Sequence, residues 1–464
     1  MSHNPSSFVS RLSPHRLLIA AAVLHLALVC AISLVGKAQL LPGTFDEHGI
    51  GISFAIDSSS YRREATEMAQ LLRQRRFQDW INYRSKFRST FHIRLYSITF
   101  TLLGNVLGFG ILAAELLNLV YYLSILGLTY AIGAEVFDRR VGLLAAIAVS
   151  VWPSLLLHTT QMLRDPLFIA SMLLLIFSLS LCLQRALSIL QGFAVGVTGA
   201  VAVLLIWLCR ADMWEIVFVV LLLAVTACAV HQVKGRRFEP GKTVALMGIL
   251  LFAFSLPKAL PAIRLSDRIV SPNQVNSGYM TGRALPAYIE NRQDGSIAPW
   301  TKFSRQVGLL RHKFIAGYPL AGSNIDTNVE FGGPVDLVRY LPRAMEIGFL
   351  SPFPMMWFTT GVQVGAVGRL VAGAEMFVMY FVLTLASLTL VIQWKRLSVW
   401  FLFSTSTVGC VALGYVVVNI SSLYRMRYAF FILVIILGIK GLLIAFEKLI
   451  EPRAYLDKEL RTVT

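Results

Sequence analysis

Long runs of apolar residues, separated by short polar stretches, recur along most of the chain. Many of these runs approach about 20 residues, the length at which an α-helix crosses a hydrocarbon core about 30 Å thick. Inside lipid the backbone must satisfy its own hydrogen bonds, so such runs predict membrane-spanning helices. The sequence therefore predicts an all-α polytopic membrane protein with ten spans, near 17–36, 111–134, 141–157, 166–184, 189–208, 213–230, 242–260, 369–393, 398–419 and 426–446.

Two further apolar stretches interrupt this pattern. Residues 91–110 mix polar with apolar positions, and residues 344–368 contain Pro352 and Pro354, which remove helical hydrogen bonds. Counting only one of these stretches as a span would move a basic loop to the outer side. We therefore expect both to form juxtamembrane helices, lying in the outer interface or re-entering against protein. Counting such stretches as spans raises the number to thirteen at most.

Basic residues in the short loops set the expected orientation, because such loops are rich in Lys and Arg on the cytoplasmic side. With the N-terminus inside, the inner loops DRR (138–140), QRALS (184–188), HQVKGRRFEPGK (231–242) and QWKRLS (393–398) are mostly basic. The first run is too long for the apolar part of a signal peptide, so we expect it to be retained. The predicted organisation is a cytoplasmic N-terminus (1–16), an N-terminal transmembrane module (17–260) with an outer loop at 37–110, an extracytoplasmic loop with an interfacial helix (261–368), C-terminal transmembrane helices (369–447) and a cytoplasmic tail (448–464).

Composition and charge agree with this class and narrow the partners. Hydrophobic residues make up 56% of the chain and charged residues 14%, which differs from an ordinary soluble domain. The net charge of +17 is explained by basic loops that face anionic lipid, so we expect the bilayer and not nucleic acid as partner. The five cysteines lie in or beside apolar runs, which indicates neither a disulfide framework nor a metal site.

Charged residues gather at the predicted outer ends of the spans. The acids are Glu115, Asp165, Asp212, Glu215 and Glu375, and the basic residues at the same level are His158, Arg164, Arg210, Lys258, Arg425 and Arg427. Charge within a span is costly and usually faces a cavity or a partner. An acid at a helix N-terminus also complements the helix dipole, which explains any single one of these acids equally well. Their common level favours a polar cavity that opens to the outer face.

The stretch FAIDSSSYRREATEMAQLL (54–72), after the first span, has a helical pattern. Its apolar positions recur at the spacing of one helix face, and its arginines lie off that face. These apolar positions are Tyr61, Ala65, Met68, Ala69 and Leu72. A basic amphipathic helix directly after a span is expected on the bilayer surface. The serines at 58–60 can cap its N-terminus, which leaves Asp57 to project toward the cavity.

Three motifs follow one another in the first half of the chain. They are Asp57 with Tyr61 in the first outer loop, the turn VFDRRVGLLAA (136–146), and Pro153 followed by LRDP (163–166). Their order resembles the membrane glycosyltransferases of the GT-C superfamily, in the bacterial branch related to protein O-mannosyltransferases and aminoarabinose transferases. The similarity covers about residues 17–230, and SSLYRMRYAFFILVIILGIKGL near the C-terminus is similar to the last R-x-R segment of that family.

The chain departs from the family in the first outer loop. The family often has an acidic pair followed by Tyr, whereas here Asp46 and Glu47 are followed by His48. The acid carried over is therefore Asp57, with Asp46 and Glu47 as reserve catalytic candidates.

The resemblance implies a GT-C-like fold in a bacterial inner membrane and an inverting sugar transfer at its extracytoplasmic face. The donor would be a sugar on a polyprenyl phosphate, and the acceptor a glycolipid, polysaccharide or protein. A carboxylate takes the proton of the acceptor, which makes Asp57 the candidate base. Asp165, the second catalytic candidate, would orient one of the arginines or bind acceptor hydroxyls. A phosphate leaving group needs cationic partners, which arginine suits best. The residues expected to bind substrate are Tyr61, His92, Arg94, His158, Arg164, Arg210, Arg425 and Arg427.

Two other functions compete with this interpretation. A lipid-linked polysaccharide polymerase or O-antigen ligase would use arginines of a large outer loop, and RQVGLLRHK (305–313) fits that use. A transporter or flippase would place charges at mid-depth and broken helices in paired halves, a pattern that the sequence does not show. The sequence has no D-x-D pair, Walker A loop or G-x-G-x-x-G, which argues against a nucleotide-sugar donor with a bound metal, so no cofactor is expected.

Overall fold

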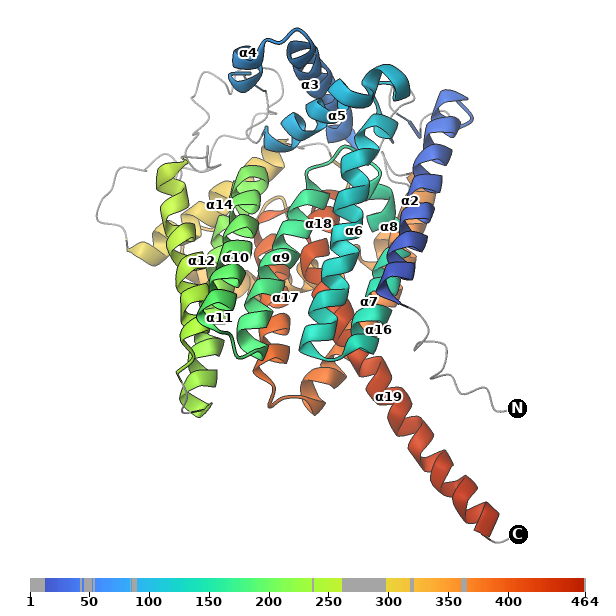
Figure 1. Ribbon diagram of the computed structural model, residues 1–464, viewed down its shortest axis with the longest axis vertical. Coiled ribbons are helices and arrows are strands. Elements are labelled where there is room, and N and C mark those ends of the chain that lie inside the picture. Colours follow the sequence, from blue (N-terminus) through green and yellow to red (C-terminus); the bar gives the residue numbers. More distant parts are fainter. Residues whose placement is uncertain are drawn as a thin grey trace.

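The chain folds into a bundle of α-helices (Figure 1). The computed structural model describes residues 13–41, 44–45, 52, 55–83, 85, 90–235, 238–260, 298–317, 321–359 and 365–462. The α-helices are α2 (Pro14–Lys37), α3 (Ile56–Arg73), α4 (Phe77–Ile81), α5 (Phe91–Leu107), α6 (Ile111–Val136), α7 (Arg139–Ser150), α8 (Pro153–Thr159), α9 (Asp165–Gln184), α10 (Ile189–Arg210), α11 (Trp214–Gly235), α12 (Pro240–Ala259), α14 (Pro299–Gly317), α15 (Pro334–Leu350), α16 (Gly365–Ile392), α17 (Leu397–Val416), α18 (Ile420–Met426) and α19 (Tyr428–Thr462). Two short 3-10 helices are η1 (Ala211–Met213) and η3 (Pro354–Met356). Within the described residues β-pairing is limited to two isolated β-bridges, so the all-α prediction is confirmed.

The long helices have the length and composition of membrane spans. Eight stretches among the described residues can cross a membrane, or nine if α7 and α8 together form one. One of the eight, Ile189–Gly235, contains both α10 and α11, each of 22 residues. A helix of that length extends about 33 Å, enough for each to cross the hydrocarbon core. The prediction of a multi-pass membrane protein is confirmed. The predicted number of ten exceeds eight because it counts α10 and α11 separately and counts α7 with α8 as one span.

The span predicted at 141–157 is not one straight helix. α7 ends at Ser150, α8 begins at Pro153, and the two axes differ by 69°. Proline has no N–H and suits the first turn of a helix, so it ends the hydrogen-bond ladder of α7 and begins that of α8. The bend places α8 immediately before the loop that leads into α9.

One apolar core joins most of the bundle, with α9 at its centre. Of the most apolar stretch of α9, 83% is buried, against α6, α10 and other neighbouring helices. α10 and α12 approach until their backbones touch, because a Cβ at Gly192 would lie 2.0 Å from the carbonyl oxygen of Gly241. Only glycine permits such an approach, which is a common basis of helix packing inside membranes.

α3, α4 and α5 lie together at one end of the bundle, which we call the α3 end, and α19 extends beyond the opposite end (Figure 1). The apolar face of α3 packs against α5 and α6, and four of its five residues, Tyr61, Ala65, Met68 and Ala69, are at most 4% exposed. The predicted amphipathic helix is therefore confirmed. The expectation that this face meets the bilayer is wrong, because α5 covers it.

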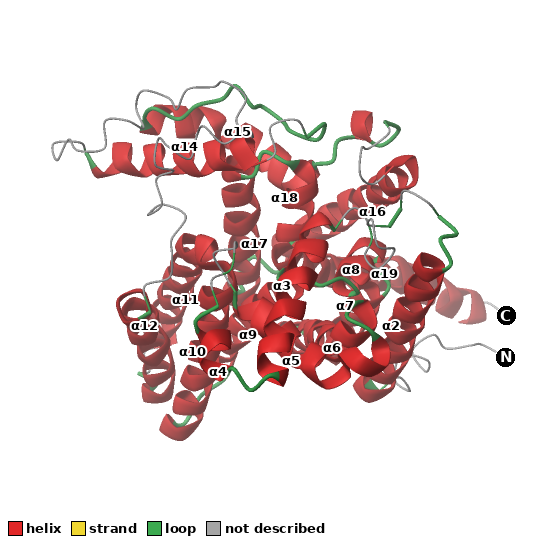
Figure 2. Ribbon diagram, turned by 90° about the horizontal axis from the view of Figure 1, so that it is seen from above, coloured by secondary structure: helices red, strands yellow, loops and turns green. Residues whose placement is uncertain are grey.

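A second layer of helices borders the bundle at one edge. Figure 2 shows α14 and α15 along this edge, with α17 and α18 beside them. α15 packs closely on α17, since a Cβ at Gly348 would lie 2.3 Å from the carbonyl oxygen of Cys410. Neither α5 nor α15, each of 17 residues, is among the candidate spans.

Candidate active site

Asp57 lies at the α3 end, in the first turn of α3. The helix begins at Ile56, so the serines at 58–60 lie inside it and not before it, and no side chain caps its N-terminus. The predicted serine cap is therefore wrong. Ser58 has a different role, since its Oγ accepts a hydrogen bond of 3.3 Å from the backbone N–H of Met162. This bond joins the start of α3 to the loop that precedes Asp165.

Asp165 is buried in the first turn of α9, where a carboxylate complements the positive end of the helix dipole. Its Oδ1 accepts a hydrogen bond from Nη2 of Arg210, the last residue of α10. Arg210 is itself buried and lies 3.8 Å from Asp212, measured from Nη1 to Oδ2. Its Nε and Nη1 have no hydrogen-bond partner within the described part of the chain. A buried guanidinium with unused donors can accept a further anion.

Arg425, near the end of α18, bridges the two acids. Its Nη2 lies 3.3 Å from Oδ2 of Asp57, and its Nη1 lies 3.8 Å from Oδ2 of Asp165. Arg164, directly before α9, lies within electrostatic reach of Asp57, Asp165 and Asp212. Three arginines and three aspartates from α3, α9, α10, η1 and α18 thus meet at one place. We call Asp57, Arg164, Asp165, Arg210, Asp212 and Arg425 the charge cluster.

Tyr61 and His92 lie beside this cluster, with their rings edge to face and their centroids 4.5 Å apart. Burial raises the pKa of Tyr61 to about 12, so its hydroxyl is protonated at neutral pH. Burial, together with the positive charge of Arg164, lowers the pKa of His92 to about 3, so its ring is neutral there. Neither ring nitrogen of His92 has a hydrogen-bond partner among the described residues. A neutral, buried donor and acceptor without a partner indicates a place for a polar ligand.

His158 of α8 and Glu375 of α16 support the charge cluster, and the contacts of Glu375 were not predicted from the sequence. His158 is within electrostatic reach of Arg425 and Asp165, and its Nδ1 lies 2.5 Å from the carbonyl oxygen of Ser154. Glu375 accepts hydrogen bonds from the backbone N–H and hydroxyl of Ser154, at 2.6 and 2.5 Å, and one from the hydroxyl of Tyr424. The carboxylate therefore joins α16 to α8 and α18. The sequence predicted correctly that Glu375 lies toward the N-terminal end of its helix. No sequence pattern indicated that Ser154 and Tyr424 would be its hydrogen-bond partners.

The loop between α8 and α9 is held by contacts from several elements. Gln161 accepts a hydrogen bond of 3.1 Å from the backbone of Ile52, and Tyr96 donates one of 3.3 Å to the carbonyl of Leu163. At its start, Thr159 lies 3.1 Å from the buried His25, which in turn contacts Glu115 at 2.7 Å. These contacts fix the backbone that presents Arg164 and Asp165.

Two of the residues expected to bind substrate, Arg94 and Arg427, have partners outside the charge cluster. Arg94 donates to the carbonyl of Ile81 at 2.7 Å and stacks on Trp80, so it holds α4 against α5. Arg427 is 1% exposed and donates to the carbonyl oxygens of Gly348 and Ser351, at the end of α15. Asp46 and Glu47 lie outside the described residues.

The chain was compared with known proteins, and it matches no family model, no curated protein and no solved structure. Within the described residues, no group of three or more His, Cys, Asp and Glu side chains is arranged to hold a metal ion.

Proposed function

We propose that the protein is a membrane glycosyltransferase that moves a sugar from a polyprenyl-phosphate donor to a hydroxyl group at the extracytoplasmic face. The observation that carries this proposal is the convergence of Arg164, Arg210 and Arg425 on Asp57 and Asp165 at one end of a membrane bundle. The carboxylates hold the arginines together. A donor phosphate would replace part of that negative charge and bind to the guanidinium groups.

The reaction needs one base and one stabilised leaving group. In this proposal the acceptor oxygen attacks the anomeric carbon and Asp57 takes its proton. The bond between that carbon and the phosphate oxygen breaks, and the phosphate leaves with the electron pair. Asp57 suits the role of base because its side chain is 27% exposed, whereas Asp165 is 5% exposed and bound to Arg210. Asp165 then keeps the arginines in place, and Tyr61 and His92 contact the sugar or the phosphate.

The polymerase or ligase alternative receives less support. It relies on the arginines of residues 305–313, and Arg311 of that stretch is buried and bound to backbone carbonyls of α17 and of the 321–333 loop. The transporter alternative predicts charges at mid-depth, whereas the charge cluster lies at helix ends.

The test of this proposal is Asp57→Asn, assayed as sugar transfer from a polyprenyl-phosphate donor in detergent or vesicles. Loss of a positioned base lowers the rate by about 10²-fold or more, while the folded protein keeps a side chain of the same size. Asp79→Asn is the matched control, because Asp79 is an exposed acid on the nearby α4 and should tolerate the change.

Asp46→Asn and Glu47→Gln should be measured in parallel, with the thermal stability of every variant. Normal transfer by Asp57→Asn with a stable but inactive Asp46→Asn or Glu47→Gln would assign the base to that pair. Full activity in all three variants would refute a carboxylate base in this part of the chain.

A further inference from the structure

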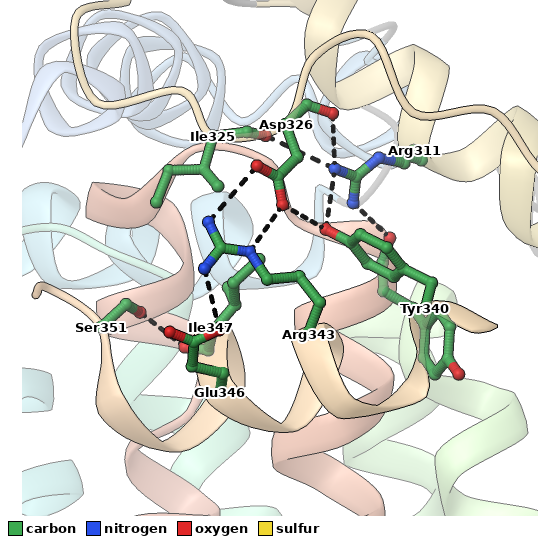
Figure 3. A network of polar contacts seen from close by, with 9 residues as sticks. Arg311, Ile325, Asp326, Tyr340, Arg343, Glu346, Ile347 and Ser351 are labelled. Atoms are coloured by element: carbon green, nitrogen blue, oxygen red, sulfur yellow. Dashed lines mark hydrogen bonds and ion pairs between the residues drawn. The ribbon is translucent and has the colours of Figure 1, made fainter. Parts of the chain in front are cut away.

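Arg311 of α14 is a buried arginine outside the charge cluster, and most of its hydrogen bonds go to backbone carbonyls (Figure 3). Its Nη1 donates to the carbonyl of Tyr415 at 2.8 Å, at the end of α17. Its Nη2 donates to the carbonyl of Asp326 at 2.8 Å and to the hydroxyl of Tyr340 at 3.2 Å. One guanidinium thus ties together α14, α15, the end of α17 and the loop at 321–333.

The carboxylate of Asp326 completes this arrangement (Figure 3). It accepts hydrogen bonds from the hydroxyl of Tyr340 at 3.0 Å and from Nε of Arg343 at 2.9 Å. Arg343 also donates to Glu346 one turn further along α15, at 2.8 Å. We call Arg311, Asp326, Tyr340 and Arg343 the outer clamp. It holds residue 326 in place from both its backbone and its side chain.

The residues directly before Asp326 pair with the residues that begin α18. The backbone N–H of Ile325 donates to the carbonyl of Val418, and that of Ile420 donates to Ser323, each at 3.1 Å. Between these two bonds lies the β-bridge of Asn324 with Asn419, whose side chains also bond at 3.2 Å. Asn419 is the N-cap of α18, so the paired segment determines where α18 begins.

We propose that Arg311 is a positioning residue for the charge cluster, acting through the segment 323–326 and α18 on Arg425. Arg425 lies five residues after the start of α18, a rise of about 7.5 Å along a rigid helix. A shift at the start of α18 is therefore carried directly to the guanidinium that bridges Asp57 and Asp165. Misplacement by about 1 Å is enough to disturb catalysis. The guanidinium of Arg425 lies 3.3 Å from Asp57 and 3.8 Å from Asp165, so a shift of that size away from the two carboxylates would break both ion pairs.

The proposal rests on the proposed function only in one respect, that Arg425 binds the donor. Its geometric part, the dependence of α18 on Arg311, stands apart from that function. The competing explanation is that α18 is held by its own apolar packing, since Ile420, Leu423 and Met426 are buried. The two explanations differ in what removal of Arg311 does to the distance between α3 and α18.

The experiment measures that distance by pulsed electron resonance on the full chain in lipid nanodiscs. Spin labels are placed on Arg63→Cys, an exposed position of α3, and Ser422→Cys of α18, in a background with Cys30→Ser because Cys30 is the exposed cysteine. A reference pair on Val197→Cys of α10 and Val244→Cys of α12 reports on the rest of the bundle.

Arg311→Met should widen the distance distribution between α3 and α18 and leave the reference pair unchanged. Arg311→Lys keeps the charge without the fork and should restore part of the order. Arg339→Met is the matched control, because Arg339 is an exposed arginine of α15 and should change neither pair. If Arg311→Met does not fold, Arg343→Met removes only the side-chain half of the clamp and should give a smaller widening of the same pair.

The transfer assay gives a second readout. Arg311→Met should raise the donor KM about tenfold with a smaller change in kcat, the scale of losing one charge-assisted hydrogen bond. An unchanged distance between α3 and α18 would overturn the proposal, and so would widening of both pairs, which indicates a general loss of stability. In a third outcome only the distance distribution between α3 and α18 widens, and no variant, wild type included, transfers sugar. That outcome would support the positioning role and refute the proposed function.

Discussion

Arg425 and Arg427 are two residues apart, and the structure predicts opposite consequences when each is replaced by methionine. Arg427 binds the C-terminal end of α15, where helix carbonyls have no partner within their own helix. It donates to the carbonyl of Gly348 at 3.1 Å and to that of Ser351, and its guanidinium stacks on Phe431 at 4.2 Å. Each buried carbonyl left without a donor costs about 1–3 kcal/mol, so Arg427→Met should lower the free energy of unfolding by about 2–6 kcal/mol.

Arg425→Met is the matched variant. It removes ion pairs to carboxylates, and its side chain is 14% exposed beside a carboxylate that is 27% exposed. Asp165 retains its bond to Arg210, so no buried charge is left without a partner. Such an ion pair contributes about 1 kcal/mol or less to folding, so stability should hardly change. Donor use should fall strongly, because the variant loses a cation that is proposed to bind the donor phosphate.

The assay combines reversible unfolding in mixed micelles with the donor KM of the folded fraction, for both variants and for Arg427→Lys. Lysine keeps a positive charge at the helix end but lacks the fork that reaches two carbonyls, so it should recover only part of the stability. A fully stable Arg427→Met protein that no longer uses the donor would refute this reasoning. It would place Arg427, and not Arg425, at the phosphate.

Two further predictions concern packing and pH. Gly192→Ala should destabilise the protein by about 1–3 kcal/mol in the unfolding assay, because α10 and α12 must separate. The control is Gly248→Ala, whose new Cβ has no atom within 4 Å. It should be neutral or slightly stabilising in the same assay. Folding lowers the pKa of His92 from 6.5 to about 3. Between pH 6.5 and about 3 the unfolded chain therefore binds a proton that the folded protein does not bind. The free energy of unfolding should decline as pH drops through this range. His92→Phe should flatten this decline in thermal unfolding measured across the pH range, and an equally steep decline would contradict a buried neutral His92.

The helices were predictable because lipid restricts the backbone to helices and a span shows directly as an apolar run. Each predicted span except 141–157 falls mainly on one described helix, and neither α5 nor α15, from the stretches at 91–110 and 344–368, is among the candidate spans. The bend before Pro153 was missed because the apolar run continues through it. The covered face of α3 was missed for a different reason. An apolar face is recognised from its periodicity, but periodicity does not say whether lipid or another helix covers it.

The charge cluster was predictable only in part, because the sequence shows the level of a charge along a helix but not its direction. Asp57, Arg164, Asp165, Arg210 and Arg425 share one level, and the structure brings them together. Glu375 shares that level too, yet its hydrogen bonds to Ser154 and Tyr424 make it a link between helices. Partners from distant parts of the chain decide between these roles.

The R-x-R segment shows why resemblance alone cannot separate the two roles. Arg425 lies within α18, whereas Arg427 follows it directly, between α18 and α19. Positions two residues apart along a helical backbone differ in direction by about 200°, so the two side chains point to opposite sides. One side faces the carboxylates of α3 and α9, and the other faces the carbonyl end of α15. The R-x-R segment therefore supplies one arginine for the proposed chemistry and one that binds the end of α15.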